Sequence, residues 1–319
     1  MNNKLRFFTN SIFVVYLISG LAYLVLLFLL STKVLPGFLM QLLFLIDEAL
    51  RGFQSGISLL TNRDFVQTIF FGFLTLTLLS VVFRGILTSL RQYFFSARLI
   101  KNLKPVATSK HIITFKSAVY GVFTAGLLHP QVYLSDSLKS FLSKKQLQAV
   151  LLHEFSHRRD HDPLRGYLVA LINNILPRFP LKQRLWSLYQ TTVELKSDAR
   201  AASVLGEKRP IIEALYAIIM HNNQRCAKQF AGAYFSDMPE RIPILVGDRK
   251  FNYQGAMILA SAFMILFLSL PAFTLTQKFY DCEHLVNCVQ ILVNNLKAHS
   301  SEDLGTMHPV ETFQSSISN

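Results

Sequence analysis

Charged residues are scarce in this 319-residue chain, at 16% of the total, whereas hydrophobic residues make up 51%. Soluble globular domains carry about 25% charged residues. The deficit therefore indicates segments embedded in a lipid bilayer. The 27 phenylalanines argue against a largely disordered chain.

Acidic residues are also few, which gives a net charge of +13. From Arg84 to Lys250 there are 25 Lys and Arg residues but only 11 Asp and Glu residues, a balance of +14, so the remainder carries −1. No RNP-like or zinc-finger pattern accompanies this basic segment, so we expect no nucleic-acid partner. A basic segment beside apolar runs is typical of a cytoplasmic loop near anionic lipid headgroups.

Cysteine is nearly absent, and the three that exist do not form the Cys-x-x-Cys pairs of a cysteine-based zinc site. Cys226 stands alone, while Cys282 and Cys288 lie close together. Those two form a short disulfide if their segment lies in an oxidising space, or remain unpaired on a helix. The glycines are scattered and contain no phosphate-binding loop.

Three uncharged runs predict transmembrane helices, because about 20 apolar residues cross the hydrocarbon core. Two lie in a membrane region at 1–84, at about 11–32 and 65–83, and the third covers 254–276. A cleaved signal peptide is the rival interpretation of the first run, but the run is too long and no small-x-small cleavage site follows it. Val34–Ile46 and Gly166–Leu176 are too short to span, so we expect them at the interface or packed on the domain.

The distribution of basic residues predicts the orientation in the membrane. The positive-inside rule places the N-terminus and residues 85–253 in the cytoplasm. Residues 277–319 then form a short extracytoplasmic tail. The chain is predicted to be a multi-pass protein of the inner (cytoplasmic) membrane with a cytoplasmic domain.

Within that domain the pattern changes to short strands followed by helices. Strands are expected at 111–115, 118–123 and 130–135, which are rich in β-branched and aromatic residues. Ser143 and Gln146 form a capping-box pattern that opens a helix running to about Asp160. Further helices are expected at about 184–205, before Gly206, and from Pro210.

The residues His153-Glu154-Phe155-Ser156-His157 form an H-E-x-x-H motif on the first of these helices. Positions i and i+4 share a helix face, so both imidazoles can reach one metal ion. Glu154 is offset around the helix and can act as general base for the attacking water. The alternative is an exposed polar face with two incidental histidines.

A catalytic zinc site needs a third protein ligand. His161 is a poor candidate, because eight residues separate it from His153, about 12 Å along the helix axis. Glu194 is a better one, and Asp198 lies on the same face at i+4. One carboxylate would bind metal while the other accepts the second N–H of a ligating histidine. On spacing alone, a solvated acidic pair is the simpler explanation.

These motifs together resemble the BlaR/MecR-type membrane metallopeptidases, in which H-E-x-x-H is followed by E-x-x-x-D-x-x-A. Here 36 residues separate His157 from Glu194. The resemblance covers about residues 100–250, and its weaker flanking matches are Gly126–Pro130, Val132–Leu134, Arg158–Asp160, Asp162–Leu164 and Glu240–Pro243. It implies zinc held by His153, His157 and Glu194, with Glu154 as base and Asp198 as second-shell orienter. The tail is too short for a penicillin-binding domain, so we do not expect this chain alone to sense β-lactams.

The sequence therefore predicts a mainly α integral membrane protein with transmembrane helices and a zincin-like α+β metallopeptidase domain. The expected function is zinc-dependent endopeptidase activity on protein or peptide substrates at the cytoplasmic membrane face, in signal transduction or regulator cleavage, with a regulatory protein as a further partner beside the bilayer. The substrate is expected along an edge strand, with Val132–Leu134 as the candidate. The alternatives are an HtpX-like quality-control protease and a non-catalytic zinc-containing signalling scaffold.

Overall fold

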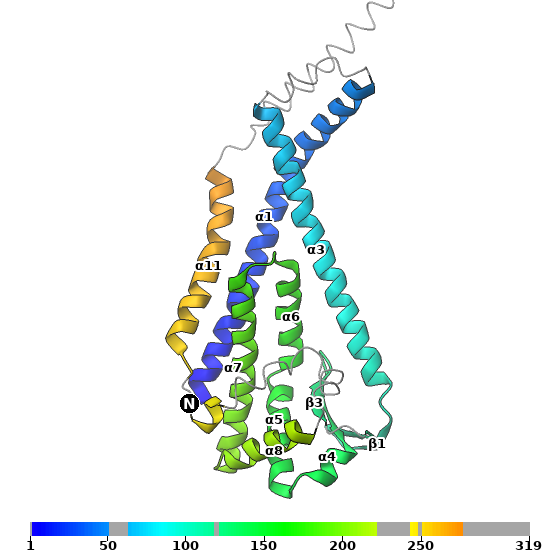
Figure 1. The fold of residues 1–319 in the computed structure, drawn as a ribbon, viewed down its shortest axis with the longest axis vertical. Helices are drawn as coiled ribbons and strands as arrows, with labels where there is room; N and C mark the ends of the chain where they lie inside the picture. Colours follow the sequence, from blue (N-terminus) through cyan, green and yellow to red (C-terminus); the bar gives the residue numbers. More distant parts are fainter. Residues whose placement is uncertain (1, 51–62, 118–120, 222–242, 248–250, 277–319) are drawn as a thin grey trace, which may run out of the picture. The chain divides into compact units, whose positions relative to one another are not determined.

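The computed structural model describes residues 2–50, 63–117, 121–221, 243–247 and 251–276 (Figure 1). Cys226, Cys282 and Cys288 fall outside these residues, as does the expected tail at 277–319, so the disulfide stays a prediction. The chain forms two compact units. One comprises Met1–Phe28 and Phe73–Ala272, and the other comprises Leu29–Gly72 and the residues from Phe273 onward.

Two long helices replace the shorter segments expected in the membrane region. Helices α1 (Asn2–Leu50) and α3 (Arg63–Lys101) include the runs at 11–32 and 65–83. By length and composition, both are able to cross a membrane. Helix α1 continues through Pro36, so the run at 34–46 is not the separate short element that we expected. Proline removes one backbone hydrogen bond, but the leucine-rich flanks favour helix strongly enough to continue it.

The third expected span, 254–276, coincides with α11 (Tyr253–Thr276). Gln254–Ile265, the part of α11 whose side chains the structure describes, is an apolar helix, and it does not test a full membrane crossing. The three-span topology therefore remains a prediction.

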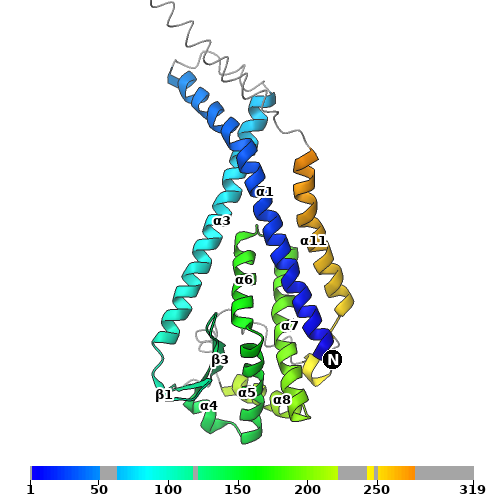
Figure 2. The same cartoon turned by 180° about the vertical axis from the view of Figure 1, so that it is seen from behind.

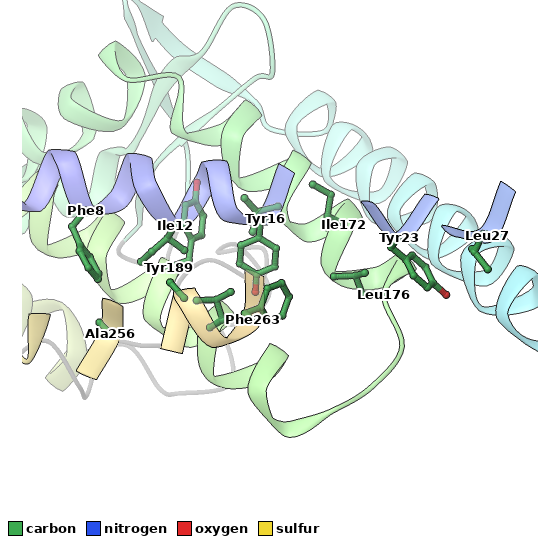
Figure 3. Close-up of a cluster of buried hydrophobic side chains, with 13 residues drawn as sticks. Phe8, Ile12, Tyr16, Tyr23, Leu27, Ile172, Leu176, Tyr189, Ala256 and Phe263 are labelled. Carbon is green, nitrogen blue, oxygen red and sulfur yellow. The ribbon is translucent and has the colours of Figure 1, made fainter. Parts of the chain in front are cut away.

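Within the first unit, an apolar cluster joins α1 and α11 to α6 (Asp162–Ile175) and α7 (Pro180–Leu205) (Figure 3). Tyr16 lies in this cluster, with its ring centroid 6.4 Å from that of Tyr189 and 5.6 Å from that of Phe263. Its hydroxyl donates to the carbonyl of Lys182 at 3.3 Å. In both views α6 and α7 run alongside the N-terminal part of α1 (Figures 1 and 2).

The short run at 166–176 is accounted for by α6. Val169, Ile172 and Leu176 are buried in the same cluster, so the run packs against other helices of the first unit. A polar contact reinforces this packing, because Arg165 on α6 donates to Asn10 of α1 at 2.6 Å and lies over the ring of Phe13.

A small sheet follows α3 in the order β1-β2-β4-β3, and its strands are β1 (Pro105–Thr108), β2 (Ile112–Phe115), β3 (Val122–Ala125) and β4 (Gln131–Ser135). Strands β2 and β4 are parallel, and the other pairs are antiparallel. Strands β2 and β4 correspond to expected ones, whereas β3 shares only Val122 and Phe123 with the strand expected at 118–123. Strand β1, all of whose residues are exposed, was not predicted, because only two of its four residues are β-branched.

The strand that contains Val132–Leu134 is not a sheet edge, so our expectation for the substrate strand was wrong. This strand, β4, pairs with β2 on one side and with β3 on the other. Its backbone donors and acceptors are therefore already used by neighbours. Among the described strands, β1 and β3 form the two edges.

The helices of the domain begin and end close to the expected residues. Helix α5 (Lys144–Arg159) has the predicted capping box, in which the Ser143 side chain accepts from the backbone of Gln146 and the Gln146 side chain accepts in return. Helix α7 starts earlier than expected, with a proline in its first turn, and ends at Gly206 with φ 76°. Helices α4 (Asp136–Phe141) and α8 (Arg209–His221) also belong to this domain.

One face of the sheet packs on α5 and α8 and fixes where α5 lies. The apolar residues of this core are Val122, Val132, Leu134, Leu138 and Ala214, with Val150, Leu151 and Phe155 of α5 packed against them. Because β3 lies on α5, residues of the edge strand reach the H-E-x-x-H segment.

Candidate metal centre

The two histidines of the motif lie one turn apart on α5 and face the same point. Both are buried, and their Nε2 atoms are 3.0 Å apart. The helix is held in place by the apolar residues that precede them, since Ala149 is fully buried and Leu152 packs beside it. The i and i+4 spacing therefore gives the convergence that the sequence predicts.

Helix α7 brings Glu194 to the same point. One of its carboxylate oxygens lies 3.4 Å from Nε2 of His153, and the other lies 3.5 Å from Nε2 of His157. One ligand atom from each of these three residues lies within 4.8 Å of the others. Donors of a tetrahedral ion with bonds of about 2.0–2.1 Å stand about 3.4 Å apart. The spacing fits a metal ion held by three protein ligands.

The other ring nitrogens of the two histidines are bound by carboxylates. Nδ1 of His153 lies 2.7 Å from Asp198, and Nδ1 of His157 lies 2.9 Å from Asp162. A carboxylate accepts a hydrogen bond from Nδ1–H, so the proton stays on Nδ1 and the lone pair lies on Nε2. Two such lone pairs 3.0 Å apart repel each other unless a cation lies between them. The orientation of both rings therefore favours a bound cation.

The negative charge around His153 also favours a bound cation. Burial by itself lowers the pKa of His153, but the carboxylates of Asp198 and Glu194 outweigh it and raise the pKa to about 10. Without a metal ion, the site therefore attracts a proton. A divalent cation satisfies the same excess of negative charge.

Asp162 and Lys196, to which the sequence patterns assign no role, support His157. Nζ of Lys196 lies 3.0 and 3.1 Å from the two oxygens of Asp162 and 2.9 Å from Asp160. Lys196 is only 3% exposed, so these ion pairs are shielded from water. Lys196 holds Asp162 in the orientation in which it meets the imidazole.

The turn between α5 and α6 explains why Asp162 points back at His157. His161 lies in the left-handed region, with φ 53° and ψ 37°, and this short turn separates α5 from α6, which continues in the same direction (Figures 1 and 2). A signal was present in the sequence, since Asp162 precedes Pro163 at a helix start, but the left-handed turn itself could not be predicted. His161 is exposed and outside the metal-ligand group, in agreement with its rejection as a ligand.

Small residues let α5 and α7 approach closely enough for this geometry. Ala149 of α5 and Ala201 of α7 are both fully buried in one cluster. Ala201 follows Asp198 by three residues and Glu194 by seven, so all three share one face of α7. This spacing explains the alanine in the E-x-x-x-D-x-x-A pattern.

Glu154, the predicted general base, is buried beside these ligands but is not one of them. One of its carboxylate oxygens accepts a hydrogen bond of 2.7 Å from the hydroxyl of Thr124 on β3. Thr124 could not be predicted, because no local pattern connects a strand threonine to a helix residue 30 positions later.

The structure thus brings together four of the residues named from the sequence, His153, His157, Glu194 and Asp198, and buries the fifth, Glu154, on the same helix as the two histidines. Comparison with known families matches residues 65–243 to the family described as BlaR1 peptidase M56, which covers more than half of the chain. The chain belongs to this family. M56 peptidases are membrane-associated metallopeptidases, so the arrangement just described is that of a metal-dependent peptidase. No curated protein matches the chain, and no solved structure does.

We expect Asp162→Asn to weaken metal binding by this M56 peptidase by about 10- to 100-fold, as losses of such outer contacts do. The amide no longer accepts strongly from Nδ1 of His157, and Lys196 loses one of its two carboxylate partners. Metal affinity can be measured by competition with a fluorescent chelator. The control is Asp160→Asn, because Asp160 also contacts Lys196 but does not contact His157. This control should change the metal affinity less than about threefold. Equal effects of the two variants would contradict this role.

Proposed function

We propose that this M56 peptidase is a zinc-dependent endopeptidase that hydrolyses protein substrates at the cytoplasmic face of the inner membrane. The observation that carries the proposal is the convergence of His153, His157 and Glu194, with Glu154 beside them. Two imidazoles and one carboxylate are a common donor set of catalytic zinc. Three protein ligands leave one position open for water or substrate, whereas structural zinc sites use four. This count favours an enzyme over a signalling scaffold.

When bound, zinc polarises the scissile carbonyl and lowers the pKa of water toward about 7. Glu154 takes the proton of the attacking water and delivers it to the leaving amine. Asp198 and Asp162 hold the two imidazoles in the tautomer that presents Nε2 to the ion. Glu194 offsets part of the ion's charge and completes the set of protein ligands.

The substrate is proposed to lie extended along β3, the edge strand beside α5. An edge strand offers unpaired backbone donors and acceptors to an extended peptide. This assignment replaces the strand containing Val132–Leu134. Membrane attachment limits substrates to membrane proteins and to soluble regulators that reach the membrane surface, which is consistent with a role in signal transduction or in protein quality control.

The proposed location follows from charge. The excess of +14 between Arg84 and Lys250 supports a cytoplasmic peptidase domain by the positive-inside rule. Helices α1 and α3 supply two membrane crossings, and α11 supplies the third.

The test uses the full chain purified in detergent and loaded with zinc. The purified chain should contain one zinc ion and cleave members of a mixed peptide library. A chelator should abolish cleavage, and added zinc, but not Mg²⁺, should restore it. New peptide N-termini identified by mass spectrometry show where cleavage occurs. A chain that binds zinc but cleaves no peptide would support the signalling scaffold and reject the peptidase.

A further inference from the structure

Thr124 is the described side chain on the edge strand that contacts the proposed base. Its hydroxyl lies 2.7 Å from Oε2 of Glu154 and 3.0 Å from the backbone carbonyl oxygen of the same residue. Thr124 and Val122 occupy alternate positions of β3 and so share the sheet face that packs on α5. The strand therefore directs this hydroxyl at the active-site helix.

From these contacts we infer that Thr124 is a positioning residue that aims the Glu154 carboxylate at the attacking water; the inference rests on the proposed peptidase function. A glutamate side chain has several rotatable bonds, and ordering it costs conformational entropy. A donor on Oε2 removes much of that freedom before the substrate arrives and leaves Oε1 to accept the water's proton. Thr124 also lies on the strand along which the substrate is proposed to bind, so it couples the base to the substrate's position.

The second contact has a different consequence. The hydrogen bond from the Thr124 hydroxyl to the backbone carbonyl oxygen of Glu154 connects β3 to α5 and does not depend on the position of the Glu154 carboxylate. A hydroxyl has one proton, so it donates fully to only one of the two oxygens at a time. A test must therefore separate an effect on the carboxylate from an effect on the strand and helix contact.

The first measurement is peptide cleavage by the zinc-loaded full chain carrying Thr124→Val, which removes the hydroxyl but keeps the shape. We expect kcat to fall about 10- to 100-fold, while KM, zinc content and melting temperature change little. Thr124→Ser keeps the hydroxyl and should restore most of kcat. The matched control is Thr114→Val on β2, whose side chain lies on the same sheet face. It should behave as the unmodified chain.

The second measurement does not depend on the identity of the substrate. A peptide hydroxamate binds catalytic zinc and gives its proton to the neighbouring base, so its affinity reports on Glu154. Thr124→Val should weaken hydroxamate binding about tenfold in the unmodified chain and less than twofold in a Glu154→Gln chain, because the two residues act as one unit. A hydroxamate that binds a chain unable to cleave peptides would reject the proposed function but would still test Thr124.

Three results would overturn the inference. The first is a Thr124→Val chain with unchanged kcat. The second is equal impairment of the Val and Ser variants. The third is the same loss of hydroxamate affinity with and without the Glu154 carboxylate, which would show that the hydroxyl only ties β3 to α5.

Discussion

Glu154→Gln is expected to lower peptide cleavage by about 10²- to 10⁴-fold, the usual contribution of a general base. The amide keeps the size of the side chain and can still accept the hydrogen bond from Thr124, but it cannot take a proton from water. Glu154 is outside the group of metal-ligating atoms, so zinc content should not change. The rate on the best-cleaved library peptide and the zinc content of the same sample check both parts.

The control for this substitution is Glu213→Gln. Glu213 lies on α8, pairs with the exposed Arg209 at 2.6 Å, and contacts none of the metal-centre residues named above. The Glu213→Gln variant should cleave the same peptide at close to the rate of the unmodified chain. If Glu154→Gln retained full activity with zinc bound, the proposed mechanism would be rejected, since another group would then have to accept the proton.

The convergence of the proposed metal ligands could be predicted in part from the sequence, because local geometry places two of them. The i and i+4 spacing of His153 and His157 guarantees a common helix face once α5 forms, and the capping box at Ser143 marks where α5 begins. Glu194 could not be placed by spacing, since an exposed acidic pair with Asp198 would give the same pattern. Its assignment came from the resemblance to a family, and the packing of Ala149 against Ala201 is the physical reason that Glu194 lies beside the two histidines.

The supporting residues could not be predicted because they depend on tertiary structure. Asp162 reaches His157 only through the left-handed turn at His161, and Lys196 reaches Asp162 only because α7 packs on α5. A buried lysine between two acidic residues reads, in sequence, as an ordinary solvated helix position. In the structure, burial raises the pKa of Asp160, but Lys196 and Arg200 outweigh burial and lower it below the usual value.

Helices α1 and α3 are longer than the sequence predicts for a related reason. In the sequence, Lys33 follows the first uncharged run and Arg84 follows the second. Both residues lie within longer helices, α1 and α3, because a helix continues wherever its backbone bonds are satisfied, whatever the polarity of its side chains. Charge marks where a helix can leave the bilayer and does not mark where the helix ends.

Glu194→Ala is expected to remove zinc as well as activity, in contrast to Glu154→Gln. The two imidazoles would remain, but no described acidic group other than Glu194 lies at their Nε2 atoms, so the ion would lose its one charged ligand. Zinc affinity should fall by far more than the about 10- to 100-fold caused by loss of a supporting contact. Competition with a chelator measures this, and Glu207→Ala is the control, because its carboxylate pairs only with the exposed Lys145 among the contacts described.

This substitution also tests the balance of charge at the centre. Glu194 and Asp198 together hold the pKa of His153 high, so removing one carboxylate lowers the attraction for any cation. Adding excess zinc should therefore restore only part of the cleavage rate to the alanine variant. Full zinc occupancy at the original affinity would show that Glu194 is not a ligand, and the third position would then have to be assigned to another donor.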